Sequence, residues 1–213
     1  MKTTFTEPDD QADSRQTVTR CAWCKATQGY RDYHDQEWGV PETGEIALFE
    51  KLCLESFQSG LSWRTILEKR DNFRRAFHHF NPERVAEFTD QDIELLMQDA
   101  GIVRNRAKIV ATINNARQLV AMHTNGKCLS ELLWSHAPAV DPSETLKAPE
   151  AEPRAKSSES TAMSKALKAR GFSWVGPVTC YSLMQACGMV NDHARGCFRF
   201  DEVARLQAEH AHR

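Results

Sequence analysis

Residues 164–187 predict two helices joined by a turn with glycine at both ends, and no other sequence feature restricts the fold as much. Gly171 suits the end of the first helix because glycine adopts the left-handed conformation without a side-chain clash. Gly176 closes the turn, and Pro177 suits the first position of the next helix, where its missing N–H is no loss. The second helix is expected to end at Gly188. Taken alone, these residues fit an ordinary helical hairpin packed on a core at least as well as a specialised motif.

Apolar residues at helical spacing predict further helices and no sheet. Start signals for these helices are Ser62, Asn81 followed by Pro82, Thr89 with Asp92, and Asn105. The residues expected to be buried are Ile46, Phe49, Leu52, Cys53, Leu54 and Phe57 in the helix at 45–58, and Val178, Tyr181, Leu183, Met184 and Cys187 in the second helix of the hairpin. We therefore predict an all-α fold.

The chain divides by composition into a folded domain and flanking segments. Residues 1–20 contain almost no aliphatic side chains and are expected to be a flexible tail, because they cannot bury enough apolar surface to fold. Residues 21–198 are expected to form the domain, with two helical lobes. A linker rich in Pro, Ser, Glu and Ala is expected at about 136–160, and a C-terminal tail at 199–213.

Charge and cysteine content limit the classes of function. The net charge of −2 argues against a strong non-specific nucleic-acid binder, although it permits a local basic face. No apolar run approaches the length of a membrane span, and the N-terminus lacks the apolar core of a signal peptide, so we expect a cytoplasmic protein. Seven cysteines without a secretion signal are expected to be thiols or metal ligands.

Five residues with metal-donor side chains lie in two groups far apart in the sequence. Cys21, Cys24 and His34 are near the start, and His193 and Cys197 are near the end. Neither group forms a full ligand set alone, but together they allow a closed four-ligand tetrahedral site of the structural kind. A catalytic zinc site, and so a zinc hydrolase, is possible only if one ligand is water.

Large aromatic side chains crowd into residues 21–44, which show little helical periodicity, so we expect an irregular segment. Aromatic residues in such a segment either enter a core or hold a flat ligand. Glu55 lies in the mostly apolar helix at 45–58, where a carboxylate is either turned to solvent or buried for a purpose, because unpaired burial is costly. Arg104, Arg106 and Lys108 fit a solvated face at least as well as a phosphate contact, and Lys168 and Arg170 beside the hairpin are better candidates for that contact.

Several blocks of sequence, in the same order, resemble the 3-methyladenine DNA glycosylase I family, a branch of the helix-hairpin-helix DNA glycosylases. They are YHDQEWGVPE (33–42), LCLESFQSGLSW (52–63), DAGIVRNRAKI (99–109), ALKARGFSWVG (166–176) and CYSLMQACGMVNDH (180–193). The resemblance runs from about Cys21 to Cys197. It implies one structural zinc ion that joins the N- and C-terminal segments through Cys21, His34, His193 and Cys197. Cys24 departs from the family pattern and is interpreted as a bystander thiol.

The resemblance also implies an activity, the hydrolysis of the N-glycosidic bond of 3-methyladenine in alkylated double-stranded DNA after base flipping. Glu55 matches the family's base-contacting glutamate, and it is the predicted catalytic residue. The predicted base-binding residues are Tyr33, Trp38, Trp63, Trp23 and Glu55, and the predicted DNA-binding residues are Gln58, Gly60, Leu61, Gly171, Gly176 and Lys168. Leu61 is the candidate for the side chain that enters the gap left by the flipped nucleotide.

One position departs from the related hairpin glycosylases. Their essential aspartate aligns with Asn191, and an amide cannot act as a general base, which suits an enzyme that depends on a labile substrate. Asp192 is displaced by one residue and is interpreted as structural. The alternative function is a zinc-stapled module that binds damaged DNA without cutting it. We expect a monomer associated with the nucleoid and not with a membrane, and with 3-methyladenine as its product.

Overall fold

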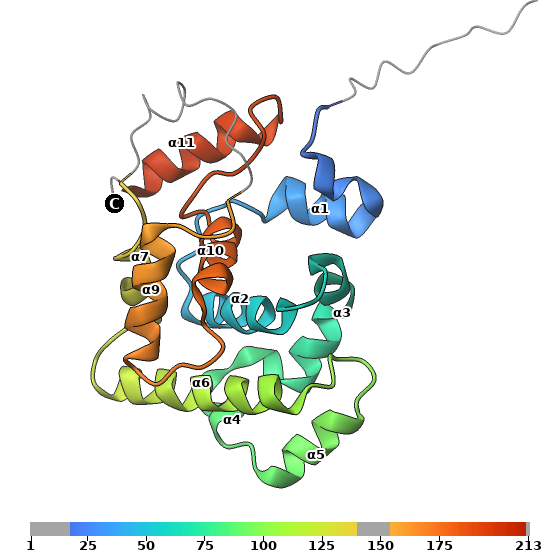
Figure 1. Ribbon diagram of the computed structural model, residues 1–213, viewed down its shortest axis with the longest axis vertical. Helices are drawn as coiled ribbons and strands as arrows, with labels where there is room; N and C mark the ends of the chain where they lie inside the picture. The colour runs from blue at the N-terminus through green and yellow to red at the C-terminus, as the bar shows by residue number, and fades with distance from the viewer. Residues whose placement is uncertain (1–17, 140–153, 212–213) are drawn as a thin grey trace, which may run out of the picture.

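Helices account for the regular secondary structure of residues 18–139 and 154–211, which are the parts of the chain that this computed structural model describes (Figure 1). No strand occurs among them, which confirms the all-α prediction for these residues. The helices are η1 (Ala22–Ala26), α1 (Gln28–Gln36), α2 (Glu45–Gln58), α3 (Trp63–Ala76), η2 (His78–Phe80), α4 (Pro82–Ala86), α5 (Asp90–Gln98), α6 (Arg106–Thr124), α7 (Leu129–Trp134), α9 (Ser158–Lys168), α10 (Pro177–Ala186) and α11 (Arg199–Ala211). None of the described helices is both long and apolar enough to cross a membrane.

The predicted helix starts are confirmed by side-chain caps. Ser62, Asn81, Thr89 and Asn105 each accept a hydrogen bond from the backbone N–H three residues further on. Each cap satisfies one of the donors that the first turn of a helix leaves without a partner. Thr89 forms a complete capping box with Asp92.

Helix α2 lies at the centre of the molecule, between α10 on one side and α6 on the other (Figure 1). Its buried residues include Phe49, Leu52 and Phe57, as predicted. Ile46 and Val178 are exposed, so their predicted burial is wrong. Both residues lie in the first turn of a helix, where the side chain projects past the packed elements into solvent.

The hairpin has the predicted form. Helix α9 ends at Lys168, and Gly171 follows with a φ of +83°, the left-handed conformation for which glycine is suited. Helix α10 begins at Pro177 after the N-cap residue Gly176, and the chain turns again at Gly188 with a φ of +71°. Hydrogen bonds from α6 fix the turn, because Asn115 donates to the carbonyl of Ser173 and accepts from its N–H.

Two segments are more regular than expected. Residues 21–44 contain η1 and α1, and the predicted irregular segment is therefore wrong over much of its length. Thr27 caps α1, and Tyr33 and His34 form its buried side.

The expected C-terminal tail instead forms α11, which buries Phe200, Val203 and Gln207 at helical spacing. Most of the predicted N-terminal tail and the middle of the predicted linker, residues 1–17 and 140–153, lie outside the described residues, while α9 already begins within the last residues of that linker.

Candidate active site and metal centre

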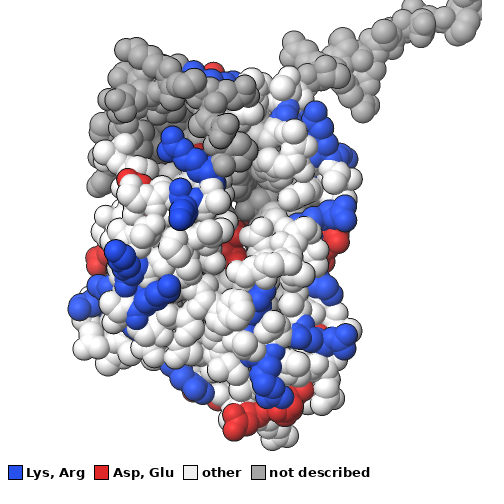
Figure 2. All heavy atoms as spheres, in the orientation of Figure 1, with Lys and Arg blue, Asp and Glu red and all other residues white. Residues whose placement is uncertain are grey.

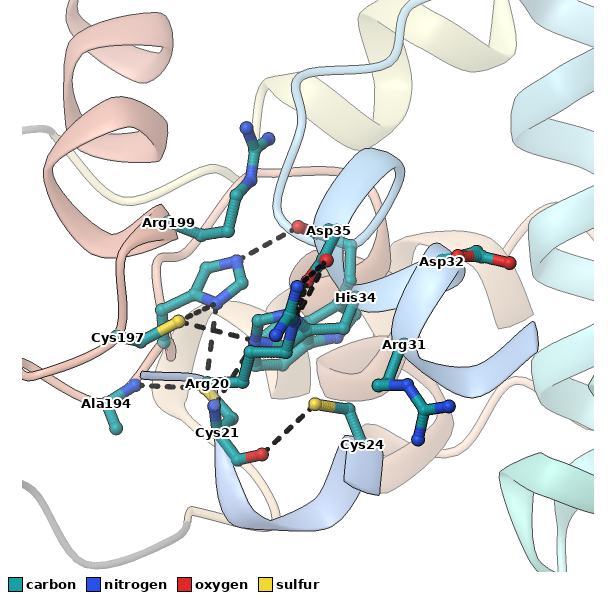
Figure 3. Close-up of polar contacts among 12 residues, drawn as sticks. Arg20, Cys21, Cys24, Arg31, Asp32, His34, Asp35, Ala194, Cys197 and Arg199 are labelled. Atoms are coloured by element: carbon teal, nitrogen blue, oxygen red, sulfur yellow. Dashed lines mark hydrogen bonds and ion pairs between the residues drawn. The ribbon is translucent and has the colours of Figure 1, made fainter. Parts of the chain in front are cut away.

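Four of the five predicted metal donors meet in one buried group, the metal cluster, formed by Cys21, His34, His193 and Cys197. Their donor atoms all lie within 4.8 Å of one another. The Sγ atom of Cys197 is 3.4 Å from Nε2 of His34 and 3.6 Å from Nδ1 of His193 (Figure 3). The cluster joins η1, α1 and the loop before α11, and it can hold a metal ion.

The second nitrogen of each histidine is held by an oxygen atom. Nδ1 of His34 lies 2.8 Å from a carboxylate oxygen of Asp35, and Nε2 of His193 lies 3.1 Å from the carbonyl oxygen of Trp38. Arg20 holds Asp35 in turn, with an N–O distance of 2.8 Å. These contacts orient each ring so that its other nitrogen faces the cluster, as the outer partners of metal-binding histidines do.

Cys24 lies outside the metal cluster, which supports its interpretation as a bystander. Its thiol is directed at the carbonyl oxygen of Cys21, 3.1 Å away (Figure 3). It is fully buried, and this burial raises its pKa. A neutral thiol with a backbone partner satisfies its own hydrogen bond and leaves the four-donor group complete without it.

The predicted base-binding aromatic residues gather beside the metal cluster. Ring centroids are 5.0 Å apart for Trp23 and Trp38 and 5.3 Å apart for Tyr33 and Trp63, and that of Trp23 is 6.4 Å from that of Tyr33. Tyr30, which the sequence analysis left out of the site, lies 4.9 Å from Trp23. Its position three residues before Tyr33 on α1 was the sequence signal that would have included it. We call these five residues the aromatic cluster.

The metal cluster and the aromatic cluster share walls. The ring of Trp38 packs edge-on against His193, with centroids 4.6 Å apart, and that of Trp23 packs edge-on against His34 at 5.3 Å. The side chains that can hold a metal therefore also fix two rings of the aromatic cluster.

Glu55 is buried in α2 with only 5% of its surface exposed. Its Oε2 atom has no hydrogen-bond partner among the described residues. Burial raises its pKa to about 8, and the charge of Lys51 opposes that shift. Burial also raises the pKa of Tyr33 well above its usual value, and the carboxylate of Glu55 adds to that shift, so the two groups feel each other's charge.

Trp63 carries a second unsatisfied polar atom. Its Nε1 is buried and has no partner among the described residues. A buried donor or acceptor without a partner loses its hydrogen bonds to water on folding and gains none in the protein. Each such atom therefore destabilises the folded state. A lone acceptor at Glu55 and a lone donor at Trp63, together with flat rings, form a site suited to a planar ligand with polar edges.

A surface pocket borders the same region. It is lined by Tyr33 and Trp63 and by two ion pairs, Glu37 with Arg70 and Glu50 with Arg74. Arg70 donates to both carboxylate oxygens of Glu37, at 2.6 and 2.9 Å. Lys51 also lines this pocket and donates to the carbonyl oxygen of Ala186. The buried carboxyl group of Glu55, which has an oxygen without a partner among the described residues, differs from these engaged side chains.

The other predicted site residues lie in two turns, the hairpin and the turn between α2 and α3, or at the ends of the helices that enter them. Leu61 is 43% exposed in the turn between α2 and α3, where Gly60 has a φ of +81°. Lys168 and Arg170 are exposed beside the hairpin, whereas Lys108 is buried and the prediction that it lies on a solvated face is wrong.

Figure 2 shows Lys and Arg side chains spread over the face drawn in Figure 1, and acidic side chains gathered at its lower end near α5. Although the net charge is −2, the basic and acidic side chains are therefore unevenly distributed on this face.

The residues around the predicted aspartate position are engaged in structural hydrogen bonds. Asn191 donates to the carbonyl oxygen of Phe200 and accepts from the backbone N–H of His193. Asp192 accepts from the hydroxyl of Tyr181 at 2.9 Å and from the amide of Gln185 at 2.7 Å. Both side chains thus hold neighbouring groups of the structure in place, which supports the structural interpretation of Asp192.

Comparison with known proteins places the chain in a family. The methyladenine glycosylase family model matches residues 23–200. DNA-3-methyladenine glycosylase 1 of Escherichia coli strain K12 is 51% identical over 183 residues, which cover 84% of this chain and 96% of the relative. DNA-3-methyladenine glycosylase of Haemophilus influenzae is 45% identical, with 84% and 97% covered. One similar solved structure is that of 3-methyladenine DNA glycosylase I from Staphylococcus aureus, which was described as the structural basis of 3-methyladenine recognition. It superposes with a TM-score of 0.75 at 34% identity, and the match covers 85% of this chain and 96% of that one. The chain belongs to the methyladenine glycosylase family.

Proposed function

We propose that this protein is a DNA glycosylase that hydrolyses the N-glycosidic bond of 3-methyladenine in alkylated double-stranded DNA, as a first step of base excision repair. The observation that carries the proposal is the buried carboxyl group of Glu55, which has an oxygen without a hydrogen-bond partner among the described residues and whose charge acts on Tyr33 of the aromatic cluster. The names of the relatives, which are 3-methyladenine DNA glycosylases, support the same substrate.

The chemistry of the substrate explains why so little catalytic machinery is needed. A 3-methyladenine nucleotide carries positive charge on the base, so its glycosidic bond is already weak and the base leaves without prior protonation. Water adds to the sugar carbon as the bond breaks, the base departs with the bonding electrons as a neutral molecule, and the added water releases one proton to the solvent. Asn191 stands where related enzymes carry an aspartate, and both ends of its amide are held by the backbone. Because the glycosidic bond of this substrate is already weak, the reaction does not require a carboxylate at that position.

Selectivity for a cationic base follows from the site. The electron-rich faces of Trp38, Trp63 and Tyr33 attract a cation. The oxygen of Glu55 accepts a hydrogen bond from the base edge, and the positive charge of the base favours the ionised carboxylate, which lowers the raised pKa of Glu55. A neutral base lacks the attraction of a positive charge to the rings and to the carboxylate, and would leave the carboxyl group of Glu55 protonated in its buried position.

DNA reaches the site through the exposed turns. Leu61 fills the gap left by the flipped nucleotide, and Gln58 and Gly60 shape the turn that carries it. The backbone N–H groups of the hairpin between Gly171 and Gly176 hold a DNA phosphate, with Lys168 close by to add a positive charge.

We assign one structural zinc ion to the metal cluster. A tetrahedral zinc ion separates its sulfur and nitrogen ligands by roughly 3.3–3.8 Å. The distances of 3.4 and 3.6 Å from Cys197 to the two histidines, and of 3.6 Å from Cys21 to His193, fit that geometry. Four protein donors fill the coordination sphere, so the ion would fasten the fold and support the aromatic cluster rather than activate water. That the protein is a cytoplasmic monomer stays a prediction from the sequence.

The test is release of free base from methylated duplex DNA, separated by chromatography. Wild type is expected to release 3-methyladenine and to leave 7-methylguanine in place. Glu55→Gln is expected to lower release at least about 100-fold, a loss of roughly 3 kcal/mol of transition-state stabilisation. Glu50→Gln is the matched control, because Glu50 lies on the same helix but is paired with Arg74. No release by folded, metal-loaded wild type would leave the non-cutting damage binder as the better account.

A further inference from the structure

Lys108 is a buried lysine that joins the two DNA-facing turns. Only 4% of its surface is exposed. Its Nζ donates hydrogen bonds to the carbonyl oxygens of Phe57 at 2.7 Å and Ser59 at 2.5 Å, at the end of α2. These carbonyls begin the turn that carries Leu61.

The location explains why a cation is stable there. The C-terminal end of a helix carries a partial negative charge and carbonyl groups without partners. The last turn of α2 contains no basic residue of its own. Lys108 therefore supplies from α6 the positive charge and the two donors that the end of α2 lacks.

The ammonium group of Lys108 also contacts the hairpin. It lies 5.4 Å from the ring centroid of Trp174, within the range of a cation–π contact. Trp174 has a φ of +58°, a conformation that is strained for a bulky residue, and its side chain is 41% exposed. Its carbonyl oxygen lies 3.2 Å from the hydroxyl of Ser56, which shares its hydrogen between this oxygen and the carbonyl of Leu52 at 2.9 Å, a second contact between the hairpin and α2.

We propose that Lys108 is a positioning residue that locks the turn at 58–61 to the hairpin, so that Leu61 and Trp174 meet DNA as one rigid surface. Strained backbone persists where the surrounding structure holds it, and it is concentrated at functional sites. A turn fixed before binding does not lose conformational entropy on binding, so the lock favours insertion of Leu61 into the duplex. The inference rests on the proposed DNA glycosylase function.

The test compares Lys108→Met with Arg117→Met. Arg117 lies on the same helix and also donates to two carbonyls at a helix end, those of Ala86 and Phe88, but it is exposed and its partners belong to the end of α4 and not to the hairpin. We would measure binding of free 3-methyladenine, single-turnover release of 3-methyladenine from duplex DNA, and the melting temperature. Free base probes the pocket alone, whereas release from DNA also requires the two turns.

Lys108→Met is expected to bind free base within about twofold of wild type but to release it from DNA about 10- to 100-fold more slowly, the change that loss of charged hydrogen bonds produces. Arg117→Met is expected to release base at the wild-type rate. In the Lys108→Met background, Leu61→Ala should slow release from DNA much less than it does in wild type. The reason is that both substitutions remove the insertion of Leu61 into the duplex.

Equal loss of free-base binding and of release by Lys108→Met, or fully additive effects with Leu61→Ala, would show a merely structural lysine and overturn the proposal. If Lys108→Met does not fold, Lys108→Gln replaces it, because its amide still donates to one carbonyl, and the same split between free base and DNA is required. Failure of wild type itself to release base would reject the proposed function instead, so the two outcomes are distinguishable.

Discussion

The Sγ atom of Cys21 lies 3.6 Å from Nδ1 of His193. The two residues stand at either end of the folded domain, and their contact closes the chain into a loop of 172 positions. The same contact fixes the segment that carries Trp23 and the loop that precedes α11. The metal cluster thus holds one side of the aromatic cluster in place.

Loss of the metal is expected to loosen the fold. Closing so long a loop stabilises a folded chain by about 5 kcal/mol through the entropy of the unfolded state. Cys197→Ser should remove the ion and lower the melting temperature by roughly 10–20 °C. Metal content by elemental analysis and thermal unfolding by circular dichroism measure both effects. Cys24→Ser is the matched control and should keep the metal; if it loses the ion as completely as Cys197→Ser does, the assigned ligand set is wrong.

Glu55 is expected to make the protein less stable as pH rises. Its pKa is about 8 in the folded protein against an ordinary value of 4.5. Between these pH values the folded state binds a proton that the unfolded state has released, so the free energy of unfolding falls as pH increases. Glu55→Gln removes this dependence and should be more stable than wild type at pH 8.5 by roughly 4–5 kcal/mol, but not at pH 4. Urea unfolding of both proteins at the two pH values measures the difference. Equal stability at pH 8.5 would place the carboxylate in solvent.

Trp63→Phe should separate stability from affinity. The substitution removes a buried indole N–H that has no partner among the described residues, an atom whose burial costs about 1–3 kcal/mol. The variant is therefore expected to be as stable as wild type or slightly more stable, despite its smaller ring. Its affinity for 3-methyladenine should fall about tenfold, because both stacking area and a donor to the base are lost. Denaturant unfolding and titration calorimetry test the two halves, and a loss of stability without a loss of affinity would assign Trp63 to the core alone.

Gly176 and Gly171 are expected to respond differently to alanine. A Cβ atom at Gly176 meets no other atom within 4 Å, and its φ of −67° is ordinary for alanine. Gly176→Ala should therefore fold normally and weaken binding to duplex DNA about tenfold, because the methyl group stands where a phosphate approaches the backbone.

Gly171→Ala should instead destabilise the fold by about 1–2 kcal/mol, because Gly171 has a φ of +83° and its Cβ would lie 3.0 Å from Gln118. Fluorescence anisotropy with a duplex and thermal unfolding distinguish the two effects. Unchanged DNA affinity in Gly176→Ala would argue that the hairpin does not hold a phosphate.

The sequence alone determined most of the local structure. Caps such as Ser62 and Asn105, and the glycines that bound the hairpin, act through backbone conformation and hydrogen bonds within a few residues. These signals can therefore be recognised in the sequence of neighbouring residues alone. The five candidate metal donors were recognisable by side-chain type, whereas the choice of Cys21, His34, His193 and Cys197 rested on the resemblance to the family.

The environment of each side chain was decided only by the tertiary structure. Ile46 and Val178 are apolar but exposed, whereas the cation of Lys108 is buried, because burial depends on which distant element covers a position. Lys108 finds its partners 49 and 51 positions away, at the end of another helix. The raised pKa of Glu55 has the same origin. It requires the whole core to exclude water from one carboxylate, and no pattern within α2 itself encodes that exclusion.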